Sequence, residues 1–235
     1  MEIRPEQQQD QAGIYRLNSA AFPTDAEARL VDALRKQASP IVSLVAIVDN
    51  RVTGHILFSP VRHWQNTGAL IMGLAPMAVA ETARNQDIGS ALIAAGMEAC
   101  TRLGAGAIVV LGHPGDYPRF GFTPASTYGI ECEYDVPEEA FMAIELTPHF
   151  LASKPGLIQY HECFANLGRN SASRTITRTG SPGSPVWRHY GHAPGDDREG
   201  RATRRIAGVD RLHGYARQGI PGNRIRAAEI PGQMV

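Results

Sequence analysis

The chain has 235 residues, in which 23 Lys and Arg balance 23 Asp and Glu, and 43% of the residues are hydrophobic. This composition provides a hydrophobic core, while the longest apolar runs, such as Ile41–Val48, fall far short of the ~20 residues of a membrane-spanning helix. Three widely spaced cysteines and an N-terminal segment without a signal-peptide pattern favour the cytoplasm over secretion with a disulfide framework.

Helices are predicted at three places along the first part of the chain, after a short strand at Glu2–Arg4. Apolar residues at helical spacing predict helices over Asp10–Phe22 and Thr24–Gln37. Glu27, three residues after Thr24, matches a capping box that opens the second of them. The same spacing predicts a third helix over Gly89–Leu103 with one buried face.

Strands are predicted where the chain is β-rich or continuously apolar: Ser43–Val48, Val52–Val61, Ala69–Val79, Ala107–Leu111, Tyr128–Tyr134 and Ala140–Leu146. Asp49, Asn50 and Arg51 predict a hairpin between the first two. Pro76 interrupts the third run, and because proline has no N–H to donate, it predicts a bulge or an unpaired edge.

The order of these elements defines the fold class. With Tyr117–Phe122 as a compact aromatic element and Gly156–Phe164 closing the domain, the order is β-α-α-β-β-β-α-β-α-β-β. This order predicts an α/β domain over residues 1–165, in which helices cover both faces of a mixed sheet.

The remaining segment, residues 166–235, has a different composition. Residues 1–165 hold 11 Lys and Arg against 18 Asp and Glu, whereas the tail holds 12 Arg, no Lys and five acids, so their net charges are −7 and +7. Gly and Pro supply 16 of the 70 tail residues, and Leu, Ile, Val and Phe only ten, which favours disorder. The tail either binds nucleic acid through phosphates or has the composition of GC-rich DNA read out of frame.

The segment Val79–Leu92 leads from the end of a strand through a polar loop into a helix. A helix N-terminus carries free N–H groups and the positive end of the helix dipole, so it suits an anion such as a pyrophosphate. Gly89 and Ser90 allow a ligand to approach the backbone there. An ordinary helix start is the alternative interpretation of the same residues.

The residues Arg84-Asn85-Gln86-Asp87-Ile88-Gly89 resemble the pyrophosphate loop, Q/R-x-x-G-x-G/A, of the GNAT superfamily of acetyl-CoA-dependent N-acetyltransferases. Gly54–Val61, Leu111–Pro114 and Tyr117–Phe122 are similar to one bacterial subfamily of predicted acetyltransferases, and the resemblance covers roughly residues 1–164. It implies a GNAT-like fold, acetyl-CoA as cosubstrate, and no metal.

Asp87 departs from this pattern, because the family has its first glycine at that position. A carboxylate beside a pyrophosphate adds like-charge repulsion of about 1 kcal/mol. Either Asp87 points to solvent and CoA binding is weakened but kept, or cofactor binding is compromised and the protein is a poor enzyme.

The resemblance also implies a mechanism, in which an amine attacks the acetyl thioester directly. It assigns the binding of pantetheine and the thioester to the backbone of Met77, Ala78 and Val79. It assigns the pyrophosphate to a loop made of Arg84, Asn85, Gln86, Asp87, Ile88, Gly89 and Ser90. Tyr117 matches the tyrosine near the CoA sulfur that protonates the departing thiolate, although an amphipathic core tyrosine is the alternative.

Several residues are candidates for the general base. Glu27 lies near the acceptor cleft of this fold, but the capping box explains it equally well, and Glu81 is either a base or a solvated loop residue. His113 has a suitable intrinsic pKa but lies in an apparent turn, and His55 is expected to be half-buried in a strand. Water can also carry the proton. The cysteines and histidines lack the paired spacing of a zinc site.

Three functions follow from these observations. The first is an N-acetyltransferase acting on an amine of a small molecule or protein, which the net negative charge of the domain predicts to be cationic. The second is a CoA-binding regulatory or weakly active relative, favoured by Asp87. The third is a nucleic-acid binder acting through the tail. No membrane partner is expected, and the sequence is compatible with a homodimer.

Overall fold

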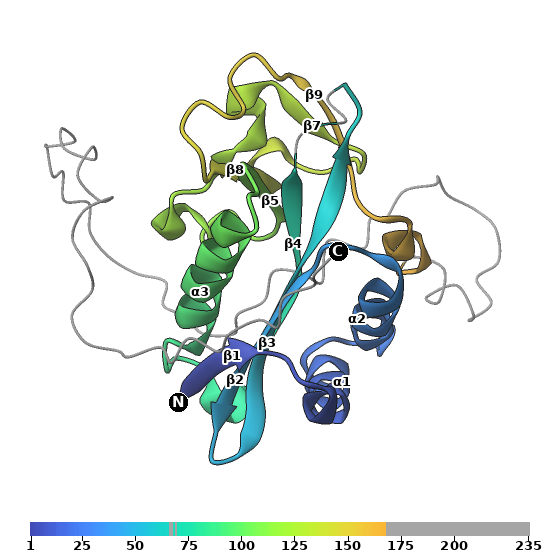
Figure 1. Ribbon diagram of the computed structural model, residues 1–235, viewed down its shortest axis with the longest axis vertical. Coiled ribbons are helices and arrows are strands. Elements are labelled where there is room, and N and C mark those ends of the chain that lie inside the picture. Colours follow the sequence, from blue (N-terminus) through green and yellow to red (C-terminus); the bar gives the residue numbers. More distant parts are fainter. Residues whose placement is uncertain (66–67, 69, 168–235) are drawn as a thin grey trace, which may run out of the picture. The chain divides into compact units, whose positions relative to one another are not determined.

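One mixed sheet organises the part of the chain that the structure, a computed structural model, describes (Figure 1). The described residues are 1–65, 68 and 70–167. All but the first two residues of the basic tail lie outside them, so its disorder and its binding to nucleic acid remain predictions. Among the described residues, no helix combines the length and the apolar character needed to cross a membrane.

The sheet follows the order β1-β2-β3-β4-β5-β8-β6, and β9 joins β3 to β7. Its strands are β1 (Glu2–Pro5), β2 (Val42–Val48), β3 (Arg51–His63), β4 (Ile71–Val79), β5 (Ala107–Leu111), β6 (Thr123–Pro124), β7 (Ile130–Cys132), β8 (Phe141–Glu145) and β9 (Gly156–Gln159). Of the pairs formed by described residues, β4–β5 and β7–β9 are parallel and the others antiparallel. The mixed sheet predicted from the sequence is confirmed.

Helices cover both faces of this sheet, as predicted (Figure 1). α1 (Gln11–Ala21) and α2 (Ala26–Gln37) pack on one face, and α3 (Ile88–Arg102) packs on the other. The two hydrophobic cores lie between these helices and the sheet. Gly96 of α3 sits so close to the Phe58 ring that a Cβ there would lie 2.3 Å from the ring, so a glycine lets α3 approach β3.

Two local predictions were wrong. The segment Tyr117–Phe122, which the predicted element order counts as a helix, contains only the 3₁₀ turn Pro118–Phe120. The capping box at Thr24 is not formed: α2 begins at Ala26 with Asp25 as its N-cap, and Glu27 is the second helical residue. Asp25 takes this place because its carboxylate pairs with Arg29 one turn later, at 2.5–2.9 Å.

A buried polar chain connects both helices of one face to the sheet. The Ser43 hydroxyl, on β2, donates to the carboxylate of Glu6, which follows β1. On β3, His55 Nε2 lies 3.0 Å from Ser43 Oγ, and its Nδ1 lies 3.3 Å from Asn18 Nδ2 of α1. Arg35 of α2 donates to the two Glu6 oxygens at 2.5 and 3.2 Å. Five elements are thereby linked through groups that the sequence did not single out as a set.

Burial and hydrogen bonding set the protonation states of the side chains in this buried polar chain. His55, which was expected to be half-buried, is fully buried, and desolvation lowers its pKa, so the ring is neutral. Because the amide nitrogen of Asn18 can only donate, His55 Nδ1 accepts and its Nε2–H donates to Ser43. Burial raises the pKa of Glu6, but its interactions with the side chains of His55, Arg35 and Ser43 outweigh burial and lower the pKa to about 2.

Glu6 is therefore predicted to give the fold a pH dependence. Its folded-state pKa is depressed from 4.5 to about 2, so its stabilisation is complete above pH 4.5 and is lost as the pH falls towards 2. Glu6→Gln should lower the free energy of unfolding by about 2–3 kcal/mol at neutral pH, and the deficit should shrink in acid. Urea denaturation across this pH range measures both effects.

The control is Glu98→Gln, which breaks a pair between two exposed side chains, Glu98 and Arg102. Such pairs contribute under about 1 kcal/mol, so this variant should differ little from the wild type at any pH. A Glu6→Gln deficit that stays constant from neutral pH to acid would contradict the role assigned to the Glu6 carboxylate.

Candidate functional site

β4 leaves its neighbour β5 halfway along its length. The two strands pair in parallel from Ile71 opposite Ala107 to Leu74 opposite Val110, and no pair follows. β4 continues to Val79 with β3 as its partner. Between these stretches, Ala75 and Pro76 of β4 stand opposite one residue of β3, which is the bulge that Pro76 predicts. From Met77 to Val79, no described strand pairs with the β5 side of β4.

The loop after β4 brings the chain to the start of α3 through unusual backbone angles. A 3₁₀ turn at Glu81–Ala83 is followed by Asn85 with φ of 60° and Asp87 with φ of 57°, both in the left-handed region. Asparagine and aspartate tolerate this region better than other non-glycine residues. Asn85, Gln86 and Asp87 are exposed, while Ile88 is buried and anchors the loop to the core.

The first turn of α3 presents free backbone donors. The N–H groups of Ile88, Gly89 and Ser90 have no acceptor within the helix, and no side chain caps them. Packing does not require glycine at position 89, because a Cβ there would lie 3.8 Å from its nearest neighbour, a methyl of Val79. Gly89 has no side chain, so the space beside these N–H groups stays open and suits the close approach of a phosphate.

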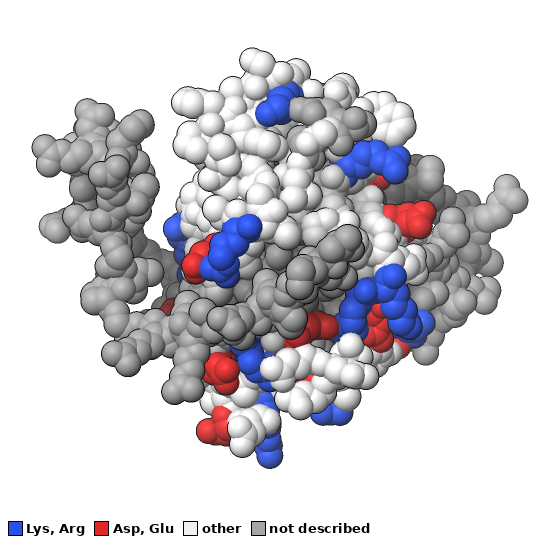
Figure 2. Space-filling view, viewed as in Figure 1, with Lys and Arg blue, Asp and Glu red and all other residues white. Residues whose placement is uncertain are grey.

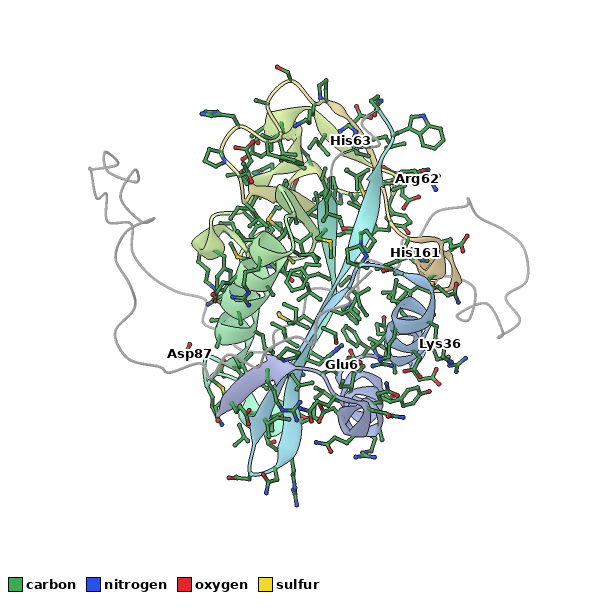
Figure 3. All side chains as sticks on the ribbon, in the orientation of Figure 1. Glu6, Lys36, Arg62, His63, Asp87 and His161 are labelled. Carbon is green, nitrogen blue, oxygen red and sulfur yellow. The ribbon has the colours of Figure 1, made fainter. Side chains whose placement is uncertain are left out.

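Asp87 is the N-cap of α3 and brings a negative charge to this end of the helix (Figure 3). Its exposed carboxylate interacts favourably with the helix dipole, and it competes with any anion for the same positive end. The left-handed backbone at Asp87 shows that the turn forms without the glycine of the family pattern.

Tyr117 follows β5 and belongs to the hydrophobic core on the α3 side, together with Leu74 and Val110. Its ring lies against the backbone of Gly112, where a Cβ would come within 2.5 Å of it. It also meets the Phe122 ring edge-on, with centroids 5.7 Å apart. Burial, and then the charge of Asp116, raise the pKa of Tyr117 well above its usual range, so the phenol stays protonated at neutral pH.

The candidate bases occupy different environments. Glu27, in the first turn of α2, is 3% exposed. Glu81 is exposed directly after β4. His113 is exposed, and its Nδ1 accepts from the Gly115 N–H at 3.2 Å, in the turn expected there. His55 is held within the buried polar chain.

A cavity of about 850 Å³ lies along α1, bordered by β1, the β2–β3 hairpin and the segment that follows β4. It brings together three residues from the sequence prediction, Val79, Glu81 and Arg84. Tyr117 and Glu27 are outside its lining. Three other arginines in the cavity come from separate elements and formed no pattern that sequence analysis could detect: Arg4, Arg16 and Arg51. In the described part of the chain, no group of His, Cys, Asp and Glu is arranged to hold a metal.

Comparisons with known proteins agree with this geometry. The model of the family described as "Acetyltransferase (GNAT) family" matches residues 11–122. The uncharacterized N-acetyltransferase YhbS of Escherichia coli K12 is 38% identical over 165 residues, which cover 70% of this chain and 98% of the relative. The uncharacterized N-acetyltransferase YjhQ of the same strain is 35% identical over 134 residues, covering 55% of this chain and 74% of the relative.

Two solved structures are similar to this chain. The crystal structure of Escherichia coli YhbS in complex with CoA superimposes with a TM-score of 0.66 at 37% identity, covering 69% of this chain and 91% of that one. A GNAT family acetyltransferase from Brucella melitensis in complex with acetyl-CoA gives a TM-score of 0.57 at 32% identity, covering 69% and 97%.

The protonation of Tyr117 is open to direct measurement. Ordinary tyrosines ionise at about pH 10. Because the pKa of Tyr117 is raised, we expect this phenol to remain protonated in that range and to add nothing to the phenolate absorbance. Native wild type and Tyr117→Phe should therefore show the same rise in phenolate absorbance through that range. In denaturant, the rise in phenolate absorbance of Tyr117→Phe should be smaller than that of the wild type by the contribution of one tyrosine. A shortfall in the native protein as well would show that the phenol is accessible and ionises normally.

Proposed function

The chain belongs to the GNAT acetyltransferase family, and from this premise we propose that it transfers the acetyl group of acetyl-CoA directly to an amine of a small molecule or protein. The observation that carries the proposal is the combination of an unpaired β4 edge at Met77–Val79 with the uncapped start of α3. The first suits an extended amide-containing chain, and the second suits a diphosphate, which are the two halves of CoA.

In this proposal, acetyl-CoA binds along the β4 edge and at the start of α3. The backbone groups of the Met77, Ala78 and Val79 stretch that point away from β3 pair with the pantetheine amides as an added strand would. The pyrophosphate is held by N–H groups at the start of α3, on the loop formed by Arg84, Asn85, Gln86, Asp87, Ile88, Gly89 and Ser90. The Arg84 side chain adds a positive charge to this loop.

The reaction needs a neutral amine, a donor for the oxyanion and a proton for the leaving sulfur. The amine nitrogen first bonds to the thioester carbon, and backbone N–H groups of β4 stabilise the oxyanion that this addition creates. The carbon–sulfur bond then breaks and the thiolate leaves. Tyr117 gives its phenolic proton to the thiolate. Glu81 or Glu27, directly or through water, takes the proton from the amine. Glu81 is favoured by its place on the cavity next to the end of β4.

A weakly active, CoA-binding relative is the second candidate, and one observation supports it. Asp87 puts a carboxylate at the positive end of the helix where the pyrophosphate is placed. Release of free CoA from acetyl-CoA, measured with a panel of amines, separates the two functions. Amine-dependent release supports the transferase. Tight binding of acetyl-CoA without release from any amine supports the regulatory relative.

Replacing the proton donor should affect turnover more than binding. Tyr117→Phe is expected to lower kcat about 100-fold, the size of one general acid–base contribution, with little change in the KM for either substrate. Steady-state kinetics measure the split. Tyr134→Phe is the control, since it removes a different phenol, one that is partly buried and whose ring lies 6.0 Å from the ring of Tyr160. An unchanged kcat in Tyr117→Phe would remove Tyr117 from the mechanism.

Removing the Asp87 carboxylate should strengthen CoA binding. Asp87→Asn keeps the left-handed backbone and is expected to lower the Kd of acetyl-CoA about fivefold, equivalent to ~1 kcal/mol of repulsion. Asp87→Gly should give a similar gain, as measured by calorimetry. Asp49→Asn is the control, because Asp49 is also an exposed acid with positive φ, in the β2–β3 turn. Unchanged affinity in both Asp87 variants would show that this carboxylate does not reach the phosphates.

A further inference from the structure

The cavity along α1 concentrates positive charge in a domain that is otherwise acidic. Four of the 11 Lys and Arg in residues 1–167 line it, but only three of the 18 Asp and Glu. On the face of the molecule drawn in Figure 2, blue and red side chains are mixed and white areas separate them. The cavity is thus a local exception to the net charge of −7.

One of the four arginines is already neutralised. Arg4 donates to both carboxylate oxygens of Asp10, at 2.6 and 3.0 Å, and that pair lowers the pKa of Asp10. Glu2 adds a second negative charge close to Arg4. The other three arginines, Arg16, Arg51 and Arg84, form no ion pair with any residue that the structure describes.

The unpaired arginines lie at different places around the cavity. Arg16 projects from α1 and Arg51 from the β2–β3 hairpin, and both are exposed. Gly13 of α1 packs closely on Val52, where a Cβ would lie 2.8 Å from a valine methyl, and this contact brings α1 against β3 next to Arg51. Arg16 and Arg51 thus face the same space from two elements, as a site for a carboxylate or phosphate requires.

Another border of the cavity is the end of β4, where the Ala80 N–H donates to the Thr53 carbonyl of β3 at 2.8 Å. Val79, Ala80 and Glu81 line it there, directly after the backbone stretch that we assign to the acetyl-CoA thioester. Small side chains at Ala20 and Ala21 of α1 leave the space open. A volume of about 850 Å³ is sufficient for a small metabolite with groups at both borders.

We infer that this cavity binds the acceptor, and that the acceptor is an amine that also carries a carboxylate or phosphate. Arg16 and Arg51 hold the anionic group, and Glu81 faces the amine at the end of β4. The inference rests on the proposed acetyl transfer and replaces the cationic acceptor that the net charge predicts. Net charge steers distant encounter, whereas the charges lining a cavity decide what binds in it.

Matched pairs of amines test the inference. Butylamine is compared with 4-aminobutanoate, and ethanolamine with its phosphate ester, each with the wild type, Arg16→Gln and Arg51→Gln. The anionic member of each pair should have a kcat/KM at least about tenfold higher in the wild type, the effect of one charge-assisted hydrogen bond. Each variant should lose most of that preference because the KM for the anionic amine rises. The kcat/KM for the neutral amines should not change.

Arg62→Gln is the control, since Arg62 is an exposed arginine at the other end of β3, far from Arg51 along the strand (Figure 3). It should leave the preference intact. Equal rates for the two members of each pair, or equal losses for both in the variants, would overturn the inference. Thermal unfolding confirms that each variant is folded.

CoA itself is another source of phosphate, so a second arm compares acetyl-CoA with its 3′-dephospho analogue. If Arg16→Gln and Arg51→Gln weaken binding of acetyl-CoA but not of the analogue, the cavity serves the donor and the inference fails. Unchanged binding of both donors supports it.

A binding measurement separates this inference from the proposed function. Addition of 4-aminobutanoate should shift the Nε–H NMR signals of Arg16 and Arg51, and not that of Arg62, whether or not turnover occurs. Shifts without acetylation of any amine would support the anion site and refute acetyl transfer. Absence of shifts together with acetylation of neutral amines would support acetyl transfer and refute the anion site.

Discussion

The separation of β4 from β5 after Leu74 is the constraint from which the rest of the site follows. If β4 and β5 continued side by side, their backbone N–H and C=O groups would hydrogen-bond to each other and none would be left for a ligand. Instead the bulge at Ala75 and Pro76 changes the register of β4 against β3, and pairing with β5 stops before it. The backbone from Met77 to Val79 is left with one partner strand, and the loop that follows delivers the start of α3 to the same region.

The buried polar chain around Glu6 has a complementary role, because it ties α1, which borders the cavity, and the neighbouring α2 to the sheet. Asn18 connects α1 to His55, and Arg35 connects α2 to Glu6. Removing one partner of such a chain would leave buried polar groups unsatisfied, which costs more than the bond itself contributes. The position of α1 against β3, and with it the spacing of Arg16 and Arg51, depends on contacts that include this chain and the packing of Gly13 on Val52.

Local sequence patterns predicted the elements well where local forces dominate. β5 has the predicted bounds, Ala107–Leu111, since a short, continuously apolar run has few alternatives inside a sheet. The helix predicted over Gly89–Leu103 is α3, shifted by one residue. The capping box at Thr24 failed by one residue: Asp25 is the N-cap of α2 and pairs with Arg29, while Thr24 Oγ1 accepts from the Ala26 N–H at 3.3 Å. At Tyr117–Phe122, proline and glycine limit the helix to one short turn.

By itself, the sequence determined the order of the helices and strands from β1 to β5, the bulge at Pro76 and, through the loop from Arg84 to Gly89, the family resemblance. These properties depend on residues that are close together in the chain, so periodicity and motifs can detect them. The tertiary structure alone decided that Glu6, Ser43 and His55 form one hydrogen-bonded chain, and that Arg16 and Arg51 face one cavity beside Glu81. Those groups come from separate elements, and only the packing of α1 on the sheet brings their charges into the same space.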